Sequence, residues 1–291
     1  MKQAILITAY KNYHHLEEII AFFDDDFEIY IHIDRKSKIT KQELLRLEQF
    51  DIVKLISQKY KVNWGGFNHL KSIVYLSEMA LKNPQNYYFH LISGHDFPIK
   101  KVSDFKSFFR NTDKEYLNFF EVPFSGWGDS GGLDRLGYYN LYDLFNWKIN
   151  FQKRIIKKIL YWQKKIGFKR ELPLLIPKLY GGSTWWSLSR ACLNYVVVYS
   201  KQDKKIFNRF KYTFCSEEFY FQTVLMNSSF KSKICTDNLR FIDWSNRNGN
   251  NPSVLDETDF ENLCLSNSFF ARRFEYPISL KIRNKIKIFF K

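Results

Sequence analysis

Two apolar runs near the start of the chain, Ile5-Leu6-Ile7-Thr8-Ala9 and Glu28-Ile29-Tyr30-Ile31-His32-Ile33, decide the fold. Each run is short and apolar, as expected of a strand that is buried on both sides. Tyr13–Phe23 lies between them and has apolar residues at helical spacing. A strand, a helix and a second strand in this order are typical of a parallel sheet with helices on both faces. We therefore predict an α/β fold.

The rest of the chain continues this alternation. Further strands are expected at Val53–Ile56, Tyr87–Ile92, Tyr116–Phe120 and Leu239–Trp244. The sequence has no internal repeat, low-complexity tract or obvious linker, so we predict one domain over residues 1–276, with a mostly parallel central sheet flanked by helices. Residues 277–291 form a basic tail in which Lys and Arg alternate with Ile and Phe, and we expect this tail to be an interfacial membrane anchor.

The composition indicates an anionic partner. The 291 residues include 45 Lys and Arg against 30 Asp and Glu, and the net charge of +15 favours nucleic acid, a membrane surface or a phosphorylated substrate. The four cysteines are widely spaced without a Cys-x-x-Cys pair, which argues against a zinc site and fits reduced thiols. Because no signal peptide and no membrane-spanning run is seen, we expect a cytoplasmic protein.

The segment 147–170 has a composition of its own, with Lys and Arg interleaved among Ile, Leu, Phe and Trp. Ile155, Ile156 and Ile159 share one face of a predicted helix, and most of the basic residues lie elsewhere on it. This pattern predicts a basic amphipathic insertion that suits an anionic membrane surface. A helix that simply packs one face on the core and exposes the other explains the pattern equally well.

Polar groups gather where predicted strands end. Asp34 follows the second strand, and His95-Asp96 follows the strand at Tyr87–Ile92. The carboxyl ends of parallel strands are where open α/β sheets bind ligands. Gly65-Gly66 precedes a predicted helix, where a paired glycine lets a ligand approach backbone amides, although most such pairs are only turns. His95-Asp96 is either a catalytic pair or a structural element of its loop.

Ser216-Glu217-Glu218 places two adjacent carboxylates at the start of an apolar helical run. Acids in a first helical turn are favoured by the unpaired amides, so they can be simple capping groups. An apolar setting can also raise the pKa of one carboxylate and prepare it for proton transfer. Trp185-Trp186, in another predicted strand, is a candidate platform for a sugar ring.

Six motifs in this order resemble the core-2/I-branching β-1,6-N-acetylglucosaminyltransferase family, glycosyltransferase family 14, together with its peptide O-xylosyltransferase relatives. They are Ile31-His32-Ile33-Asp34-Arg35-Lys36-Ser37, Val62-Asn63-Trp64-Gly65-Gly66, Ser93-Gly94-His95-Asp96-Phe97-Pro98-Ile99, Gly181-Gly182-Ser183-Thr184-Trp185-Trp186-Ser187-Leu188-Ser189-Arg190, Ser216-Glu217-Glu218 and Phe270-Ala271-Arg272-Arg273-Phe274. The resemblance runs from Ala4 to Phe274 and is that of a bacterial-type member.

The resemblance implies a GT-A-like nucleotide-sugar fold and an inverting reaction that uses no divalent metal. It makes Glu218 the general base, and Arg273 and Arg240 the ligands of the diphosphate. Arg273 stands where the family has Lys. The other expected donor-binding residues are Arg272, Asp34, Gly65 and Gly66. The other expected substrate-binding residues are Glu121, Arg135, His95, Asp96, Trp185, Trp186, Glu217 and Trp244.

The sequence thus predicts a metal-independent inverting glycosyltransferase. We expect it to transfer GlcNAc from UDP-GlcNAc to a hydroxyl of a glycan or lipid-linked oligosaccharide, in surface polysaccharide synthesis at the inner face of the plasma membrane. No cofactor and no nucleic acid partner are expected. UDP-xylose and UDP-galactose remain open as donors. A non-catalytic polyanion-binding protein remains the alternative from another class, because of the +15 charge.

Overall fold

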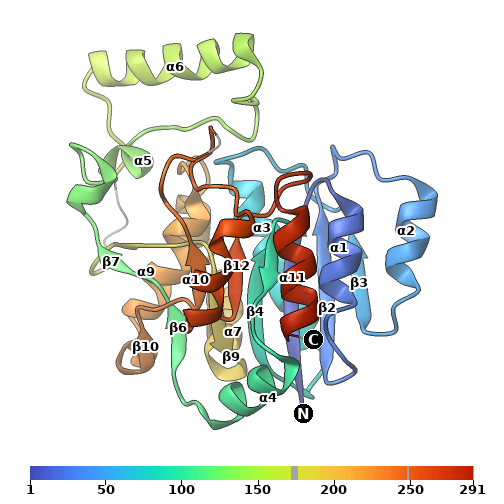
Figure 1. Ribbon diagram of the computed structural model, residues 1–291. Helices are drawn as coiled ribbons and strands as arrows, with labels where there is room; N and C mark the ends of the chain where they lie inside the picture. The colour runs from blue at the N-terminus through green and yellow to red at the C-terminus, as the bar shows by residue number, and fades with distance from the viewer. Residues whose placement is uncertain (172–175, 248, 291) are drawn as a thin grey trace.

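The computed structural model describes residues 1–171, 176–247 and 249–290, and in these residues seven strands form the central sheet in the order β10-β6-β9-β4-β1-β2-β3 (Figure 1). The strands are β1 (Lys2–Ala9), β2 (Phe27–Ile33), β3 (Val53–Ser57), β4 (Asn86–Ser93), β6 (Glu115–Leu117), β9 (Trp186–Ser189) and β10 (Ile234–Cys235). β1 is parallel to both β2 and β4, whereas β9 is antiparallel to β4 and β6. The prediction of a mostly parallel α/β sheet is confirmed.

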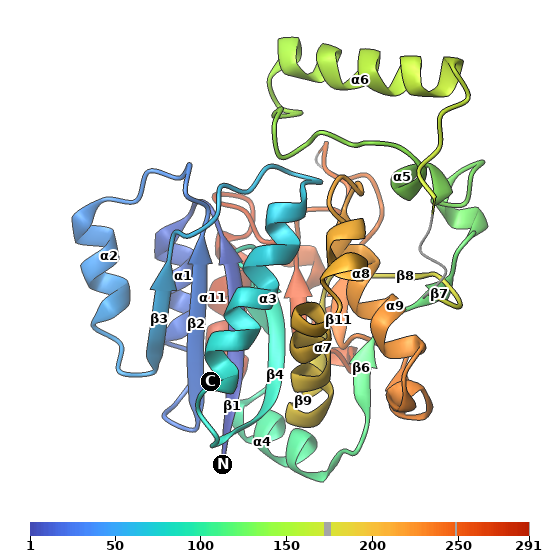
Figure 2. The ribbon, with the colours of Figure 1, turned by 180° about the vertical axis from the view of Figure 1, so that it is seen from behind.

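Helices cover both faces of this sheet (Figures 1 and 2). One face carries α1 (Tyr13–Ile20), α4 (Val102–Asn111) and α11 (Leu280–Phe290). The other carries α3 (Phe67–Leu81), α7 (Arg190–Gln202) and α9 (Tyr220–Met226). Further helices are α2 (Lys41–Glu48), α5 (Leu133–Gly137), α6 (Asn150–Lys165), α8 (Lys204–Arg209) and α10 (Phe260–Leu265), with 3₁₀ turns η1 (Ser125–Trp127), η2 (Ser216–Glu218), η3 (Ser229–Lys233) and η4 (Glu257–Asp259).

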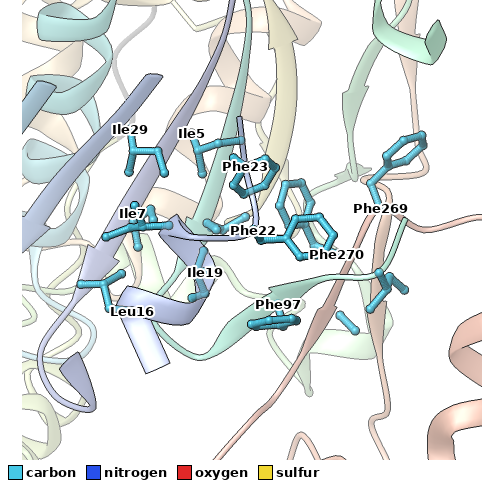
Figure 3. Close-up of a cluster of buried hydrophobic side chains, with 14 of the residues drawn as sticks. Ile5, Ile7, Leu16, Ile19, Phe22, Phe23, Ile29, Phe97, Phe269 and Phe270 are labelled. Atoms are coloured by element: carbon cyan, nitrogen blue, oxygen red, sulfur yellow. The ribbon is translucent and has the colours of Figure 1, made fainter. Parts of the chain in front are cut away.

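The core consists of two hydrophobic clusters, one on each face of the sheet. Successive strand residues point to opposite faces, so β1 sends Ile5 and Ile7 into one cluster and Ala4 and Leu6 into the other. The first cluster is rich in phenylalanine, and Figure 3 shows part of it around α1 and β1. This packing on both sides explains why the opening strands are apolar throughout.

Two smaller sheets extend the main one. β11 (Arg240–Ile242), β12 (Phe270–Arg272) and β5 (Asp96–Pro98) pair in that order, with β12 parallel to β11 and antiparallel to β5. This pairing places the basic–aromatic motif of β12 beside the loop that follows β4. β7 (Phe120–Glu121) pairs with β8 (Tyr180–Gly181) at the other side of the molecule.

The C-terminal segment is part of the domain. In α11 the side chains of Ile282, Ile286 and Phe290 are buried in the phenylalanine-rich cluster. Arg283 is also buried, and its Nη1 donates to Glu18 Oε2 at 2.7 Å. These buried side chains fix α11 to the domain, whereas Ile278, Leu280, Ile288 and Phe289 are exposed, so a membrane contact of this tail stays a prediction. None of the described helices could cross a bilayer.

The predicted basic helix in 147–170 is confirmed as α6, which stands apart from the body at the end of the sheet where the parallel strands finish (Figures 1 and 2). Of its residues only Ile156 is fully buried. Phe151, Tyr161 and Trp162 are the exposed apolar side chains of the helix, and Ile166, just after it, is exposed as well.

Candidate active site

The predicted gathering of polar groups at the carboxyl edge of the sheet is seen at the ends of β1, β2 and β4. The Gly94 N–H, just after β4, donates to Thr8 O of β1 at 2.9 Å, and the Asp34 N–H, just after β2, donates to Ala9 O at 2.9 Å. The loops that leave the three strands therefore start side by side. Most of the predicted site residues lie on these loops or on segments that pack against them.

Glu218 lies at the end of η2, with 29% of its side chain exposed. Its Oε2 accepts a hydrogen bond from Arg135 Nη1 at 2.7 Å, which is a strong charge-assisted contact. The Arg135 guanidinium lies 3.9 Å from the ring centre of Trp127 and 5.5 Å from that of Phe214. Two of the predicted site residues are thus brought into direct contact, and aromatic rings hold the cation in place.

The surroundings of Glu218 raise the pKa of this carboxyl to about 7. Burial is the largest cause, and the neighbouring negative charge of Glu217 adds to it. The hydrogen bond and positive charge of Arg135 oppose the shift. A carboxylate whose pKa lies near neutral pH is well matched to accept a proton during a reaction and to release it afterwards.

Glu217 points away from Glu218 and is buried. Its Oε1 lies 2.9 Å from His69 Nδ1, and His69 Nε2 lies 3.4 Å from Thr8 Oγ1 at the end of β1. The two adjacent acids therefore have different surroundings, since Glu218 contacts an arginine and Glu217 contacts a histidine. Sequence reasoning missed His69 because a single histidine at the start of α3 carries no spacing signal.

A basic cluster surrounds Glu275, which lies three residues after the end of β12. Lys11 Nζ and Arg273 Nη2 donate to the Glu275 carboxylate at 2.9 and 2.6 Å, and His95 Nδ1 lies 3.3 Å from it. Although burial opposes the shift, the hydrogen bonds from Lys11 and Arg273 lower the pKa of Glu275 to about 2. Burial lowers the pKa of His95 to about 3, so this histidine is neutral at neutral pH. Lys11 is a candidate anion ligand that the sequence reasoning missed.

Arg240 does not belong to this cluster. Its guanidinium is buried and donates to Leu91 O at 2.9 Å, to Trp186 O at 2.7 Å and to Ser187 Oγ at 2.8 Å. These bonds tie β11 to the main sheet. Because both Nη groups of Arg240 are bonded inside the protein, we do not assign Arg240 to the diphosphate, and its predicted role as a diphosphate ligand stays a prediction.

The tryptophan pair is not a sugar platform. Trp186 is fully buried and packs on Phe221, with ring centres 5.1 Å apart. Trp185 is buried as well, and the Arg272 guanidinium covers its ring at 4.3 Å. Asp96 lies under the same arginine, with Oδ1 3.5 Å from Arg272 Nε. Trp185, Trp186 and Asp96 are therefore buried against other protein groups, and we assign none of them to the substrate.

The paired glycines face protein rather than open space. Gly65 has φ +78°, and a Cβ on it would collide with the Phe214 ring. A Cβ on Gly66 would collide with Asp143 Oδ1. Gly65 O accepts a hydrogen bond from the Cys215 N–H at 3.0 Å, which holds the turn before Glu218. The two glycines thus pack the loop that carries the acids, and their predicted donor-binding role stays a prediction.

Three other predicted residues lie on separate segments. Asp34 Oδ1 accepts from the Lys36 and Val62 N–H groups, both at 3.0 Å, and so joins two loops at the sheet edge. Glu121 is exposed on β7 and pairs with Lys178 at 3.2 Å. Trp244 is 66% exposed beyond β11. Their predicted binding roles stay predictions, as does the role of Arg272 toward the donor.

In the part of the chain that the structure describes, no three His, Cys, Asp or Glu side chains come together as a possible metal site. Metal independence remains a prediction of the sequence.

Comparison with known proteins identifies the family to which the chain is similar. A model of the Core-2/I-Branching enzyme family matches residues 4–263. Xylosyltransferase 2 of Rattus norvegicus is 25% identical over 284 residues, covering 90% of this chain and 30% of that protein. Beta-glucuronosyltransferase GlcAT14A of Arabidopsis thaliana is 24% identical over 288 residues, covering 92% of this chain and 60% of that protein.

The chain thus spans less than a third of the xylosyltransferase and under two thirds of the glucuronosyltransferase. Among solved structures, the crystal structure of S. aureus TarS 1–349 overlaps with a TM-score of 0.37 at 14% identity, covering 80% of this chain and 57% of that one.

Proposed function

We propose a sugar-transfer function for this chain on the premise that it belongs to the Core-2/I-Branching enzyme family, whose model matches residues 4–263. This membership confirms the resemblance seen in the sequence. The proposed activity is an inverting glycosyl transfer from a nucleotide sugar to a hydroxyl group. The observation that carries it is Glu218, a half-buried carboxylate at the sheet edge with a pKa of about 7 and a fixed arginine beside it.

In the proposed reaction Glu218 takes the proton from the acceptor hydroxyl while the hydroxyl oxygen attacks the anomeric carbon. The new carbon–oxygen bond forms on one face of the sugar as the bond to the nucleoside diphosphate breaks on the other, so the anomeric centre inverts. The diphosphate leaves with the bonding electron pair. Arg135, bonded to Glu218 Oε2 at 2.7 Å, orients the base so that its other oxygen is available to the acceptor.

The leaving diphosphate requires positive charge, and Lys11 and Arg273 are the proposed source. Both are partly exposed, at 40% and 26% of their side chains. They replace the predicted pair of Arg240 and Arg273. Preorganised cations of this kind stabilise developing negative charge without a metal ion.

The acidic pair and the basic cluster both reach the end of β1. Thr8 contacts His69 beside the acidic pair, and Lys11 belongs to the basic cluster. Only two residues, Ala9 and Tyr10, separate Thr8 from Lys11, so the Cα atoms of Thr8 and Lys11 lie at most about 11 Å apart. We propose that both groups act on one donor molecule.

The donor remains a proposal in its finer detail. UDP-GlcNAc is our first choice, and UDP-xylose and UDP-galactose are the alternatives. One of the relatives named above is a xylosyltransferase, which supports UDP-xylose as a donor. The other is a β-glucuronosyltransferase, so we include UDP-glucuronate as a fourth candidate donor. We propose a glycan or lipid-linked oligosaccharide as acceptor.

A donor screen tests this function. The purified chain is incubated with each of the four UDP-sugars, and UDP release is measured with and without an oligosaccharide acceptor, in buffer with EDTA and in buffer with Mn²⁺. We expect one donor to be consumed, and equally fast in EDTA. No turnover of any UDP-sugar and no saturable binding of UDP would refute the function. Activity that is lost in EDTA and restored by Mn²⁺ would refute metal independence alone.

A polyanion-binding protein explains the +15 charge but not a carboxylate with a raised pKa at the sheet edge. Steeply salt-dependent binding of DNA without a UDP site would favour that alternative.

A further inference from the structure

The helix α6 is held by the loop that precedes it. Gln152 Oε1 accepts from the Asn146 N–H at 2.6 Å, and Gln163 exchanges two hydrogen bonds with the backbone of Tyr139, at 2.8 and 3.1 Å. Ile156 is buried on the same side. This inner face fixes the orientation of the helix, and the opposite face is left to solvent.

The outer face of α6 carries large apolar side chains. Phe151 is 71% exposed, Trp162 48% and Tyr161 59%, and Ile166 at the helix end is 71% exposed. Phe151, Trp162 and Ile166 lie within one arc of the helix because their spacing follows the helical period. An aromatic and aliphatic face of this kind, open to water, marks an interaction surface.

The charge around these side chains has one sign. The helix contributes six basic residues, Lys153, Arg154, Lys157, Lys158, Lys164 and Lys165. No Asp or Glu occurs anywhere in residues 144–170. Arg154, Lys158 and Lys165 are exposed and share the arc of Phe151 and Trp162. The partner of this face is therefore anionic and also accepts aromatic and aliphatic side chains.

The helix lies on the same side of the molecule as the candidate site. Trp147, just before α6, packs on Tyr142 and Trp64, with ring centres 5.7 and 6.3 Å apart. Lys148 Nζ lies 5.2 Å from the Tyr10 ring, at the end of β1. A surface bound by α6 would thus face the carboxyl edge of the sheet (Figure 2).

We propose that the outer face of α6 binds the surface of a bilayer that contains anionic phospholipid. Arg154, Lys158 and Lys165 contact the phosphate groups, and Phe151, Trp162 and Ile166 enter the boundary between headgroups and acyl chains. A soluble polyanion would use the cations but would leave the exposed Phe and Ile without a partner, so the lipid surface fits better. The proposal does not depend on sugar transfer.

Vesicle flotation with the full chain tests the proposal. The vesicles contain equal parts of phosphatidylglycerol and phosphatidylcholine, and pure phosphatidylcholine vesicles serve as the neutral comparison, at about 0.15 M NaCl. We expect binding to the anionic vesicles alone. The triple variant Arg154→Glu, Lys158→Glu, Lys165→Glu should partition at least about 100-fold less, since each basic residue near the surface contributes about fivefold or more.

A matched control carries Lys41→Glu, Lys54→Glu and Lys82→Glu, three exposed lysines on other elements with the same change in net charge. It should keep most of the binding. An equal loss in both triple variants would mean that net charge, and not α6, attracts the protein, and would overturn the proposal. Absence of wild-type binding to anionic vesicles would overturn it as well.

Insertion of the aromatic side chains has its own readout. Brominated phospholipid should quench part of the tryptophan fluorescence of the bound protein, and Trp162→Phe should remove most of that quenching. Phe151→Gln should weaken binding to anionic vesicles although the charge is unchanged. Binding without quenching, together with equal affinity for a soluble polyanion such as DNA, would overturn the lipid proposal in favour of a polyanion.

Discussion

Replacing Glu218 with Gln tests the proposed base most directly. The amide oxygen of Gln can still accept the hydrogen bond that Arg135 Nη1 now donates to Glu218 Oε2 at 2.7 Å, so the side chain should keep its place. The amide cannot take a proton from the acceptor hydroxyl. We expect kcat to fall by about 10²–10⁴-fold, the usual contribution of a general base. UDP affinity should change little, because Lys11 and Arg273 are untouched.

The pH dependence gives the same prediction a second measurement. Because the carboxyl pKa is about 7, kcat/KM of the unaltered protein should rise about tenfold per pH unit below neutral pH and level off above it. The residual activity of the Gln variant should lack this rise. Initial rates of UDP release with saturating acceptor, from pH 5.5 to 8.5, provide the profile, and calorimetric titration of UDP provides the affinity.

The exposed Glu48→Gln, on α2, is the matched control and should leave the profile unaltered. Circular dichroism of both variants excludes a general loss of fold. Full activity of Glu218→Gln with an unchanged pH profile would refute the role of Glu218 and, with it, the proposed mechanism.

Three further outcomes are expected. Glu217→Gln removes a negative charge that raises the pKa of Glu218, so the pH profile should move to lower pH. Arg135→Gln removes a positive charge that lowers this pKa, so the profile should move to higher pH. Shifts of the two variants in the same direction would contradict our account of the pKa. Arg273→Ala should weaken UDP binding by about tenfold or more, since a hydrogen bond to a charged group contributes about 1.5–3 kcal/mol, and an unchanged calorimetric Kd would exclude the diphosphate role. Ile286→Ala should lower the free energy of unfolding by about 2–5 kcal/mol in a urea titration, and a loss below about 0.5 kcal/mol would show that α11 is not part of the core.

The sequence predicts those features that depend on local pattern. The apolar runs of β1 and β2 sit on both sides of a helical stretch, and local spacing alone is enough to indicate a parallel sheet. Glu218 follows an aromatic stretch, and its raised pKa has the apolar cause expected from the sequence. Ser93-Gly94-His95 follows a strand, and its position at the sheet edge was equally predictable.

Features that depend on long-range packing could not be predicted. A guanidinium can bind a ligand or donate to groups inside the protein, and residue type alone does not show which of these Arg240 and Arg273 do. The pair Trp185-Trp186 suggests a sugar platform in the sequence, but the two rings contact Arg272 and Phe221 from distant segments. The alternation of charge and apolar residues in α11 is the same for a core helix as for a membrane helix.

Glu275 has a consequence for how the protein handles its ligand. This carboxylate is already bonded to both Lys11 and Arg273, at 2.9 and 2.6 Å. An arriving diphosphate would have to displace a resident counter-ion, so docking becomes an exchange of one anion for another. The two cations stay aligned between turnovers, and the net gain in attraction is smaller than two bare charges would provide. Nucleotide affinity should then decline only gently as ionic strength rises, and the spent nucleotide should depart readily.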